Sequence, residues 1–159
     1  MAKAISEVTT DGLYLEEDRE QDRHVEYLAL RTPDPATCAE FYHDVFKMTP
    51  LNREEDDETH SLSDGRVTLK LIPWKISDYS GIDANRPMLD HIGFRVEDAH
   101  AVHNEIVDYV GRFAPGAAPC WLLDGREKDR KRAEQLKRAA PDSKYQYSDS
   151  NGVCFVVAD

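Results

Sequence analysis

The chain has 159 residues, of which 40% are hydrophobic and 32% charged, and its formal net charge is −11. This length and composition are typical of one globular domain, and no apolar run approaches the ~20 residues of a transmembrane helix. The acidic balance argues against nucleic acids and anionic membranes as partners, because binding to phosphate groups depends on clustered lysine and arginine.

The N-terminal segment and the cysteines indicate a cytoplasmic protein. Residues 1–22 are acidic and lack the apolar core of a signal peptide, so we expect a mobile segment and no export. The three cysteines are widely spaced and form no CxxC pair, which predicts free thiols with packing roles: Cys38, Cys120 and Cys154.

The first half of the domain begins with a strand at residues 24–32, whose alternation places Tyr27, Ala29 and Arg31 on one face. Asp34 is then a good N-cap for an amphipathic helix with Pro35 at its first position. Two short strands follow at about residues 58–62 and 67–72, joined by a turn at Asp64-Gly65. These elements predict one β-α-β-β-β unit.

The second half repeats this order after a connector at residues 74–87 that contains proline and glycine. A strand at residues 88–96 leads to a helix that Asp98 caps and Gly111 ends. A strand near residues 118–123 and a final hairpin, residues 144–148 and 153–157 around Asn151-Gly152, complete the unit.

A charged helical insert, residues 125–140, interrupts the second unit. From Arg126 to Arg138 it carries seven basic residues against three acidic ones. The pattern fits a solvated helix, or a surface that docks acidic segments of a second subunit, such as residues 54–58. The sequence leaves both roles open.

The two opening strands are near copies. Tyr27-Leu28-Ala29-Leu30-Arg31 precedes the first helix cap, and His91-Ile92-Gly93-Phe94-Arg95 precedes the second, 64 residues later. We therefore predict an α+β fold in which residues 23–159 form one domain of two βαβββ modules, at about residues 23–73 and 88–159.

Four motifs in this order resemble the vicinal oxygen chelate superfamily, which includes glyoxalase I, bleomycin-resistance proteins and extradiol dioxygenases. They are EYLALRTPDPATCAEFYHDVFKM, LSDGRVTLKL, LDHIGFRVEDAHAV and SDSNGVCFVV, and the resemblance covers about residues 24–158. It implies a cup-shaped mixed sheet with helices outside, a divalent metal held by both modules, and often a homodimer.

The resemblance also places the metal ligands, and only one matches. The family's positions fall on Tyr27, Leu69, His91 and Val156, of which His91 alone has the usual ligand type. Because a divalent cation needs three or four N or O donors, we expect a degenerate site and no cofactor. If Fe, Mn, Zn or Ni does bind, the predicted ligands are His91, Tyr27 and His60.

Other side chains could replace the missing ligands. Asp149 and Tyr147 near the last hairpin are candidates, whereas His24 lies at a strand end and alternation turns Glu26 to the opposite face.

The remaining residues of the cup predict a pocket for a small aromatic or acidic molecule. Arg31 and Arg95 would bind a carboxylate, and the apolar walls would be Leu69, Leu71, Cys154 and Val156. The alternative for the arginines is pairing with Asp34 and Asp98 or contact with solvent, and for His91 a satisfied core histidine. For Cys154 we favour inert packing.

Three functions remain open at this point. The first is a metal-independent protein that binds a small molecule. The second is an enzyme, either a diverged metal-dependent dioxygenase, lyase or isomerase that uses His91, or a metal-free one with His91 as general base and Tyr27 as acid. The third is a non-catalytic partner subunit of a homologous enzyme.

Overall fold

The computed structural model describes residues 22–82 and 86–159, so the predicted N-terminal segment lies outside the described residues except for Asp22. Within these ranges eight strands form one mixed sheet in the order β2-β3-β4-β1-β5-β8-β7-β6. The strands are β1 His24–Thr32, β2 Thr49–Pro50, β3 His60–Ser63, β4 Thr68–Pro73, β5 Met88–Arg95, β6 Cys120–Leu122, β7 Tyr145–Asp149 and β8 Cys154–Ala158.

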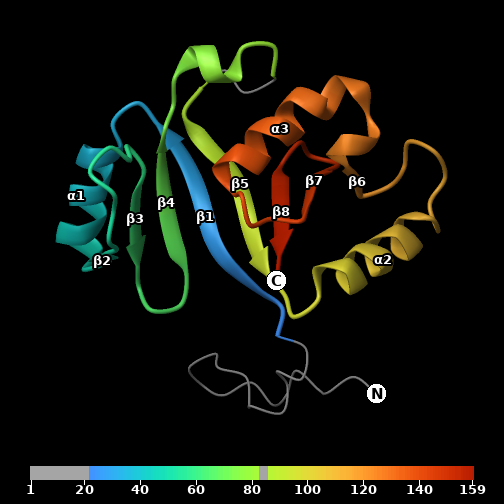
Figure 1. The fold of residues 1–159 in the computed structure, drawn as a ribbon, viewed down its shortest axis with the longest axis horizontal. Coiled ribbons are helices and arrows are strands. Elements are labelled where there is room, and N and C mark those ends of the chain that lie inside the picture. The colour runs from blue at the N-terminus through green and yellow to red at the C-terminus, as the bar shows by residue number, and fades with distance from the viewer. Residues whose placement is uncertain (1–21, 83–85) are drawn as a thin grey trace.

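The predicted pair of βαβββ modules is confirmed. Each module supplies four neighbouring strands, and the two opening strands, β1 and β5, run antiparallel at the centre of the sheet. Each opening strand also pairs in parallel with the last strand of its own module, β1 with β4 and β5 with β8. Figure 1 shows the two halves side by side in one curved sheet.

The two module helices, α1 Pro35–Phe46 and α2 Ala99–Val110, begin at the predicted caps. The Asp34 carboxylate accepts a hydrogen bond from the Thr37 amide at 3.1 Å, and Asp98 accepts one from Ala101 at 3.0 Å. These bonds satisfy amide groups that a helix start leaves without partners. None of the helices in the described residues is long and apolar enough to span a membrane.

Both module helices pack on the same face of the sheet, called here the outer face. α1 contacts a cluster that includes Leu62 and Leu71, and α2 contacts one that includes Val157. This is the predicted arrangement, in which helices lie outside the cup.

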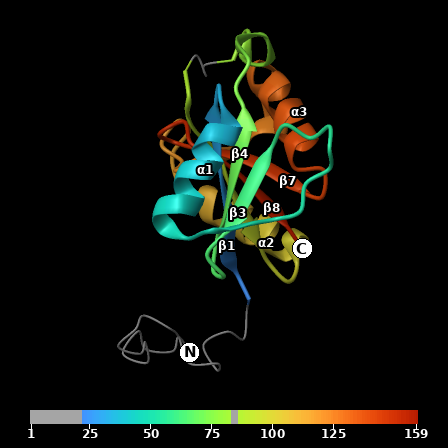
Figure 2. The same ribbon diagram turned by 90° about the vertical axis from the view of Figure 1, so that its left-hand side faces the viewer.

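The charged insert behaves differently, because its helix lies on the opposite, inner face. After two 3-10 turns, Leu123–Gly125 and Glu127–Asp129, helix α3 runs over Arg130–Ala139. Ala133 and Leu136 are buried against inner-face residues of β1 and β8. In Figures 1 and 2, α3 lies across β5 and β8, on the other side of the sheet from α1. The helix is therefore part of the core, although basic residues such as Lys131 and Arg138 stay exposed.

We predict that Leu136→Ala lowers the free energy of unfolding by about 2–5 kcal/mol, since Leu136 is fully buried and its truncation leaves a cavity under α3. Urea unfolding would measure the change. The matched control is Lys137→Ala, at an exposed position of the same helix, where a change within about 0.5 kcal/mol is expected. Equal effects of the two substitutions would contradict the packing of α3 against the sheet.

Candidate functional site

A β-bulge creates the central feature of the inner face. Across the β1–β5 pair, Ala29 lies opposite His91 and Leu30 opposite Leu89, which leaves Asp90 as an extra residue. A bulge redirects side chains that would otherwise alternate between the two faces. Here it brings neighbours in sequence together: Asp90 Oδ2 accepts a hydrogen bond from His91 Nδ1 at 2.6 Å.

The Asp90 carboxylate connects four parts of the chain. Besides His91, it accepts a hydrogen bond from the Tyr79 hydroxyl at 3.0 Å, and Arg31 and Arg132 each lie 3.2 Å from its Oδ1. Burial alone would raise the pKa of Asp90. The hydrogen bond from His91 and the charge of Arg132 outweigh burial and hold that pKa well below its ordinary value.

Tyr27 extends this network from the opposite strand. Its hydroxyl lies 2.9 Å from His91 Nε2. Because the ionised Asp90 requires a proton on Nδ1, we assign Nε2 as the acceptor and the Tyr27 O–H as the donor. Burial, with help from nearby acidic side chains, raises the pKa of Tyr27 above its usual range, so the phenol stays protonated.

The Tyr27 ring fits only because residue 93 is glycine. Tyr27 pairs with Gly93 across the two strands, and a Cβ placed on Gly93 would lie 2.1 Å from Cε1 of the ring. A side chain at this position would push the ring away from His91. The prediction that Tyr27, Gly93 and His91 share one face is consistent with this contact.

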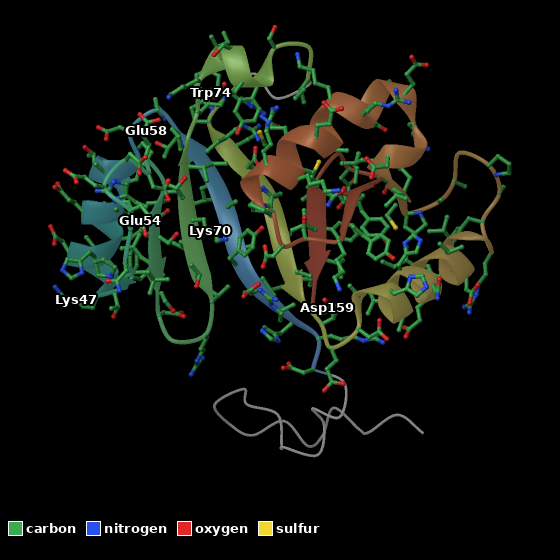
Figure 3. All side chains as sticks on the ribbon, in the orientation of Figure 1. Lys47, Glu54, Glu58, Lys70, Trp74 and Asp159 are labelled. Atoms are coloured by element: carbon green, nitrogen blue, oxygen red, sulfur yellow. The ribbon has the colours of Figure 1, made fainter. Side chains whose placement is uncertain are left out.

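Lys70 lies on the other side of the Tyr27 ring. Its Nζ is 3.8 Å from the ring centroid, within the range of a cation–π interaction. Burial lowers the pKa of Lys70, and the charges of Asp142 and Glu26 offset this only in part. Among the hydrogen bonds and ion pairs of the described residues, none involves the Lys70 ammonium. Figure 3 shows Lys70 on β4, beside the region that α3 covers.

The placement of Lys70 corrects a sequence prediction. Leu69 and Leu71 were expected to face the cup, but both pack on the outer face with α1. The strand pairing places Lys70 beside Ala29 instead. The prediction was wrong by one residue of register, and such a shift exchanges the faces of a whole strand.

The two predicted ligand-binding arginines are engaged by acidic or carbonyl groups of the protein. Arg31 is buried and donates to the carbonyl oxygens of Arg86 and Leu89 at 2.7 and 3.3 Å in addition to Asp90. Its ion-pair partner is therefore Asp90 and not Asp34.

Arg95 lies at the rim of the inner face, where it pairs with Glu26 at 3.0 Å and Asp142 at 3.2 Å and not with Asp98. A second register shift in the β1–β5 pair occurs at Glu26. Simple alternation predicted Glu26 on the opposite face, and the bulge explains why it reaches Arg95.

The candidate replacement ligands do not gather around His91. His60 pairs with Leu71 and so lies on the outer face, and His24 binds Asp22. Tyr147 binds His103 of α2. Asp149 accepts backbone hydrogen bonds within the last hairpin. Across residues 22–82 and 86–159, no three His, Cys, Asp or Glu side chains form a cluster suited to a metal.

Cys154 and Val156 lie on the inner face under α3, in one cluster with Tyr27 and Leu136. Burial raises the pKa of the Cys154 thiol, although the neighbouring Arg132 acts in the opposite direction. A buried thiol with a raised pKa is a poor nucleophile. These contacts fit a packing role.

The donor set does not fit a divalent cation. Both ring nitrogens of His91 already have partners, Asp90 and Tyr27. Positive charges also lie beside Tyr27 and Asp90, those of Lys70 and Arg132. Repulsion by these charges opposes the binding of a cation.

The sequence did not predict four residues of the site: Tyr79, Asp90, Arg132 and Lys70. The Asp-His pair in LDHIGF was a usable signal for Asp90, since a carboxylate often orients a functional histidine. Tyr79 and Arg132 come from the connector and the insert, and no local pattern brings those segments to the sheet.

We predict that Asp90→Asn lowers the free energy of unfolding by about 3–5 kcal/mol, because it leaves two buried arginines without their counter-charge. The pKa of Asp90 is lowered in the folded protein, so its contribution is fully present above the ordinary carboxyl pKa and is lost as pH falls below it. Urea unfolding measured at neutral and at acid pH checks this. Acidification should lower the free energy of unfolding less in the variant than in the wild type. Asp142→Asn, at an exposed carboxylate, should change stability little.

Several solved structures are similar to this one. A hypothetical protein from Bacillus halodurans aligns with a TM-score of 0.50 and 12% identity over 87% of this chain and 96% of its own. Methylmalonyl-CoA epimerase from Mycobacterium tuberculosis gives 0.49 and 14% over 85% and 87%. A catechol 2,3-dioxygenase gives 0.47 and 15% over 84% of this chain and 38% of its own.

No curated protein matches the sequence. The family model described as Glyoxalase/Bleomycin resistance protein/Dioxygenase superfamily matches residues 24–121, which is more than half of the chain. That match agrees with the paired modules, and the chain belongs to this superfamily, the one that its four motifs resemble.

Proposed function

We propose that this protein binds a small organic anion, such as an aromatic carboxylate, on the inner face of module one without a metal. The observation that carries the proposal is the Lys70 ammonium. It is partly buried, its pKa is lowered, and it rests on the Tyr27 ring without an acidic partner in contact. A buried cation of this kind gains free energy when an anion pairs with it.

The residues around Lys70 favour a small polar ligand. α3 covers the inner face of β1 and β8, and the inner face of β3 and β4 lies beside it (Figure 1). Strand pairing puts three hydroxyl groups on this part of the face, all partly exposed: Ser61, Ser63 and Thr68. Hydroxyl groups can donate to a carboxylate, and the edge of the Tyr27 ring offers an apolar contact for an aromatic ligand.

In this proposal Lys70 takes the carboxylate-binding role that was predicted for Arg31 and Arg95. Both arginines already have ion-pair partners within the protein, and a ligand would have to break those pairs. Lys70 requires no such exchange. Val156 and Cys154, which were predicted to line the pocket, are covered by α3. Module one is therefore the better location for the ligand.

We predict that Lys70→Met weakens binding of benzoate or cinnamate by about tenfold or more, since a charge-assisted hydrogen bond contributes about 1.5–3 kcal/mol. Calorimetric titration would measure the affinity, with a thermal-shift screen as the first step. In the wild type the affinity should fall as pH rises through the lowered pKa of Lys70, because the ammonium loses its charge.

The matched control is Lys75→Met, which removes an exposed ammonium that pairs with Glu58 outside the proposed site. Its affinity for the same carboxylates should equal that of the wild type. Benzamide, which lacks the negative charge, should bind neither protein. Unchanged carboxylate binding by Lys70→Met would contradict the proposal.

A second candidate is metal-free proton transfer, which the continuous hydrogen-bonded chain from Asp90 through His91 to Tyr27 favours. His91 would accept a proton from a ligand carbon, and Tyr27 would give one to the ligand's carbonyl oxygen. Tyr27 and His91 are 5% and 1% exposed, so the ligand must displace the Tyr27 ring to reach them.

If this candidate is correct, the wild type should catalyse exchange of hydrogen for deuterium next to the carbonyl group of a bound 2-oxo or 3-oxo acid, observed by NMR in deuterated water. Tyr27→Phe, which keeps the ring and removes the hydroxyl, should lose exchange by about 10²-fold or more and retain binding. A wild type that binds the acid without exchange would leave binding alone as the function.

The other expectations remain proposals. A non-catalytic partner subunit, a homodimer and a cytoplasmic location are compatible with the described residues. The exposed basic side chains of α3, including Lys131 and Arg138, keep a docking role for residues 126–138 open.

A further inference from the structure

A pocket opens on the outer face of the sheet, beside α1. It has a volume of about 260 Å³ and lies between this helix and the neighbouring ends of β1, β4 and β5. Cys38 and Tyr42 form its helical wall, and the lining residues of the strands include Leu30, Leu71, Met88 and Leu89. Because Lys70 precedes Leu71 in β4 and faces the inner side, the sheet separates this pocket from the proposed anion site.

The volume and lining of the pocket suit a single aromatic ring. Most of the lining side chains are apolar, which is typical of a small-molecule site, and Tyr42 supplies an aromatic wall. An apolar cavity of ~150 Å³ takes a benzene molecule, whereas drug-sized ligands occupy roughly 300–1,000 Å³. The pocket therefore has room for one ring with a small substituent.

The charges at the pocket favour a neutral ligand. Arg31 is the charged residue among the described residues that line it. Its guanidinium already pairs with Asp90 at 3.2 Å and donates to the carbonyl oxygens of Arg86 and Leu89. An anion would have to compete with these partners, and the lining offers a cation no acidic side chain. The pocket thus differs in ligand charge from the site at Lys70.

The hydroxyl group of Thr32 gives the pocket a polar contact. Thr32 Oγ1 accepts a hydrogen bond from the Asp34 amide at 3.2 Å and lies 3.4 Å from the sulfur of Cys38, which also lines the pocket. Sulfur is a weak hydrogen-bond partner, and a hydroxyl group has one donor and two acceptor positions. A ligand oxygen that takes the place of the sulfur makes the stronger hydrogen bond.

We propose that this pocket binds a small neutral phenol, with the ring between Tyr42 and the strand leucines and the phenolic oxygen bonded to Thr32. This second site goes beyond the proposed function, because its ligand has no charge and lies on the opposite face of the sheet from Lys70. Either site can bind its ligand without the other.

Alkylation of the cysteines by iodoacetamide tests the proposal in the wild type, with p-cresol as the probe. Cys38 lines the pocket and Cys120 of β6 does not, and both are partly buried free thiols. At about twice its dissociation constant, p-cresol should slow alkylation of Cys38 by about threefold, because only the unbound fraction reacts. The rate at Cys120, followed by peptide mass spectrometry, should not change, and benzoate should not protect Cys38.

Two variants separate the shape of the pocket from its polar contact. Cys38→Phe puts a ring into the pocket and should weaken p-cresol binding by about tenfold or more, as measured by calorimetric titration. Ala36→Phe is the matched control, since it adds the same ring at an exposed position of α1, and it should bind like the wild type. Thr32→Val should weaken binding of p-cresol but not of toluene, which lacks the hydroxyl group.

Three results would overturn the proposal. They are a wild type in which p-cresol protects neither cysteine or both equally, a Cys38→Phe variant that binds p-cresol like the wild type, and a Thr32→Val variant that loses p-cresol and toluene to the same extent. None of them bears on carboxylate binding at Lys70, so this site and the proposed function fail or stand separately.

Discussion

The inner face depends on the interactions of one buried group, the carboxylate of Asp90. It bonds to Arg31 of β1, Tyr79 of the connector, His91 of β5 and Arg132 of α3. Removing a charge from a buried network of this kind leaves its partners unpaired in a medium of low dielectric constant. One side chain thus fixes the positions of four segments that are far apart in the sequence.

This network makes the two halves of the cup unequal, although both modules have the same βαβββ order of elements. Arg132 of α3 pairs with Asp90 of β5, and Leu136 packs against inner-face residues of β1 and β8. Module one has no equivalent helix in the described residues, so its inner face keeps partly exposed hydroxyl groups and Lys70. The repeated order of elements therefore explains the scaffold, and the insert explains why the inner face of β8 is covered while that of β3 and β4 stays partly exposed.

The sequence predicted those parts of the structure that depend on local signals. Asp34 and Asp98 predict where their helices begin, because a cap involves residues only three positions apart. The bulges at Glu26 and Asp90 have no such signal, since an extra residue becomes visible only when two strands pair. The strand register likewise depends on the partner strand. The prediction therefore put Leu69 on the inner face, which Lys70 occupies in the structure.

The charges of the inner face also suggest how a scaffold can exchange one kind of ligand for another. A metal site requires neutral or anionic donors that converge on a cation. Here the residues around Tyr27 and His91 include Lys70 and Arg132, and the Asp90 carboxylate, which contacts His91, is already engaged by its protein partners. The protein thus supplies its own cations in the region where the motif resemblance would place a metal. Because opposite charges attract at close range in a partly buried site, such a face favours an anion. A few side chains suffice to change the preferred ligand from a cation to an anion, while the sheet that carries them stays the same.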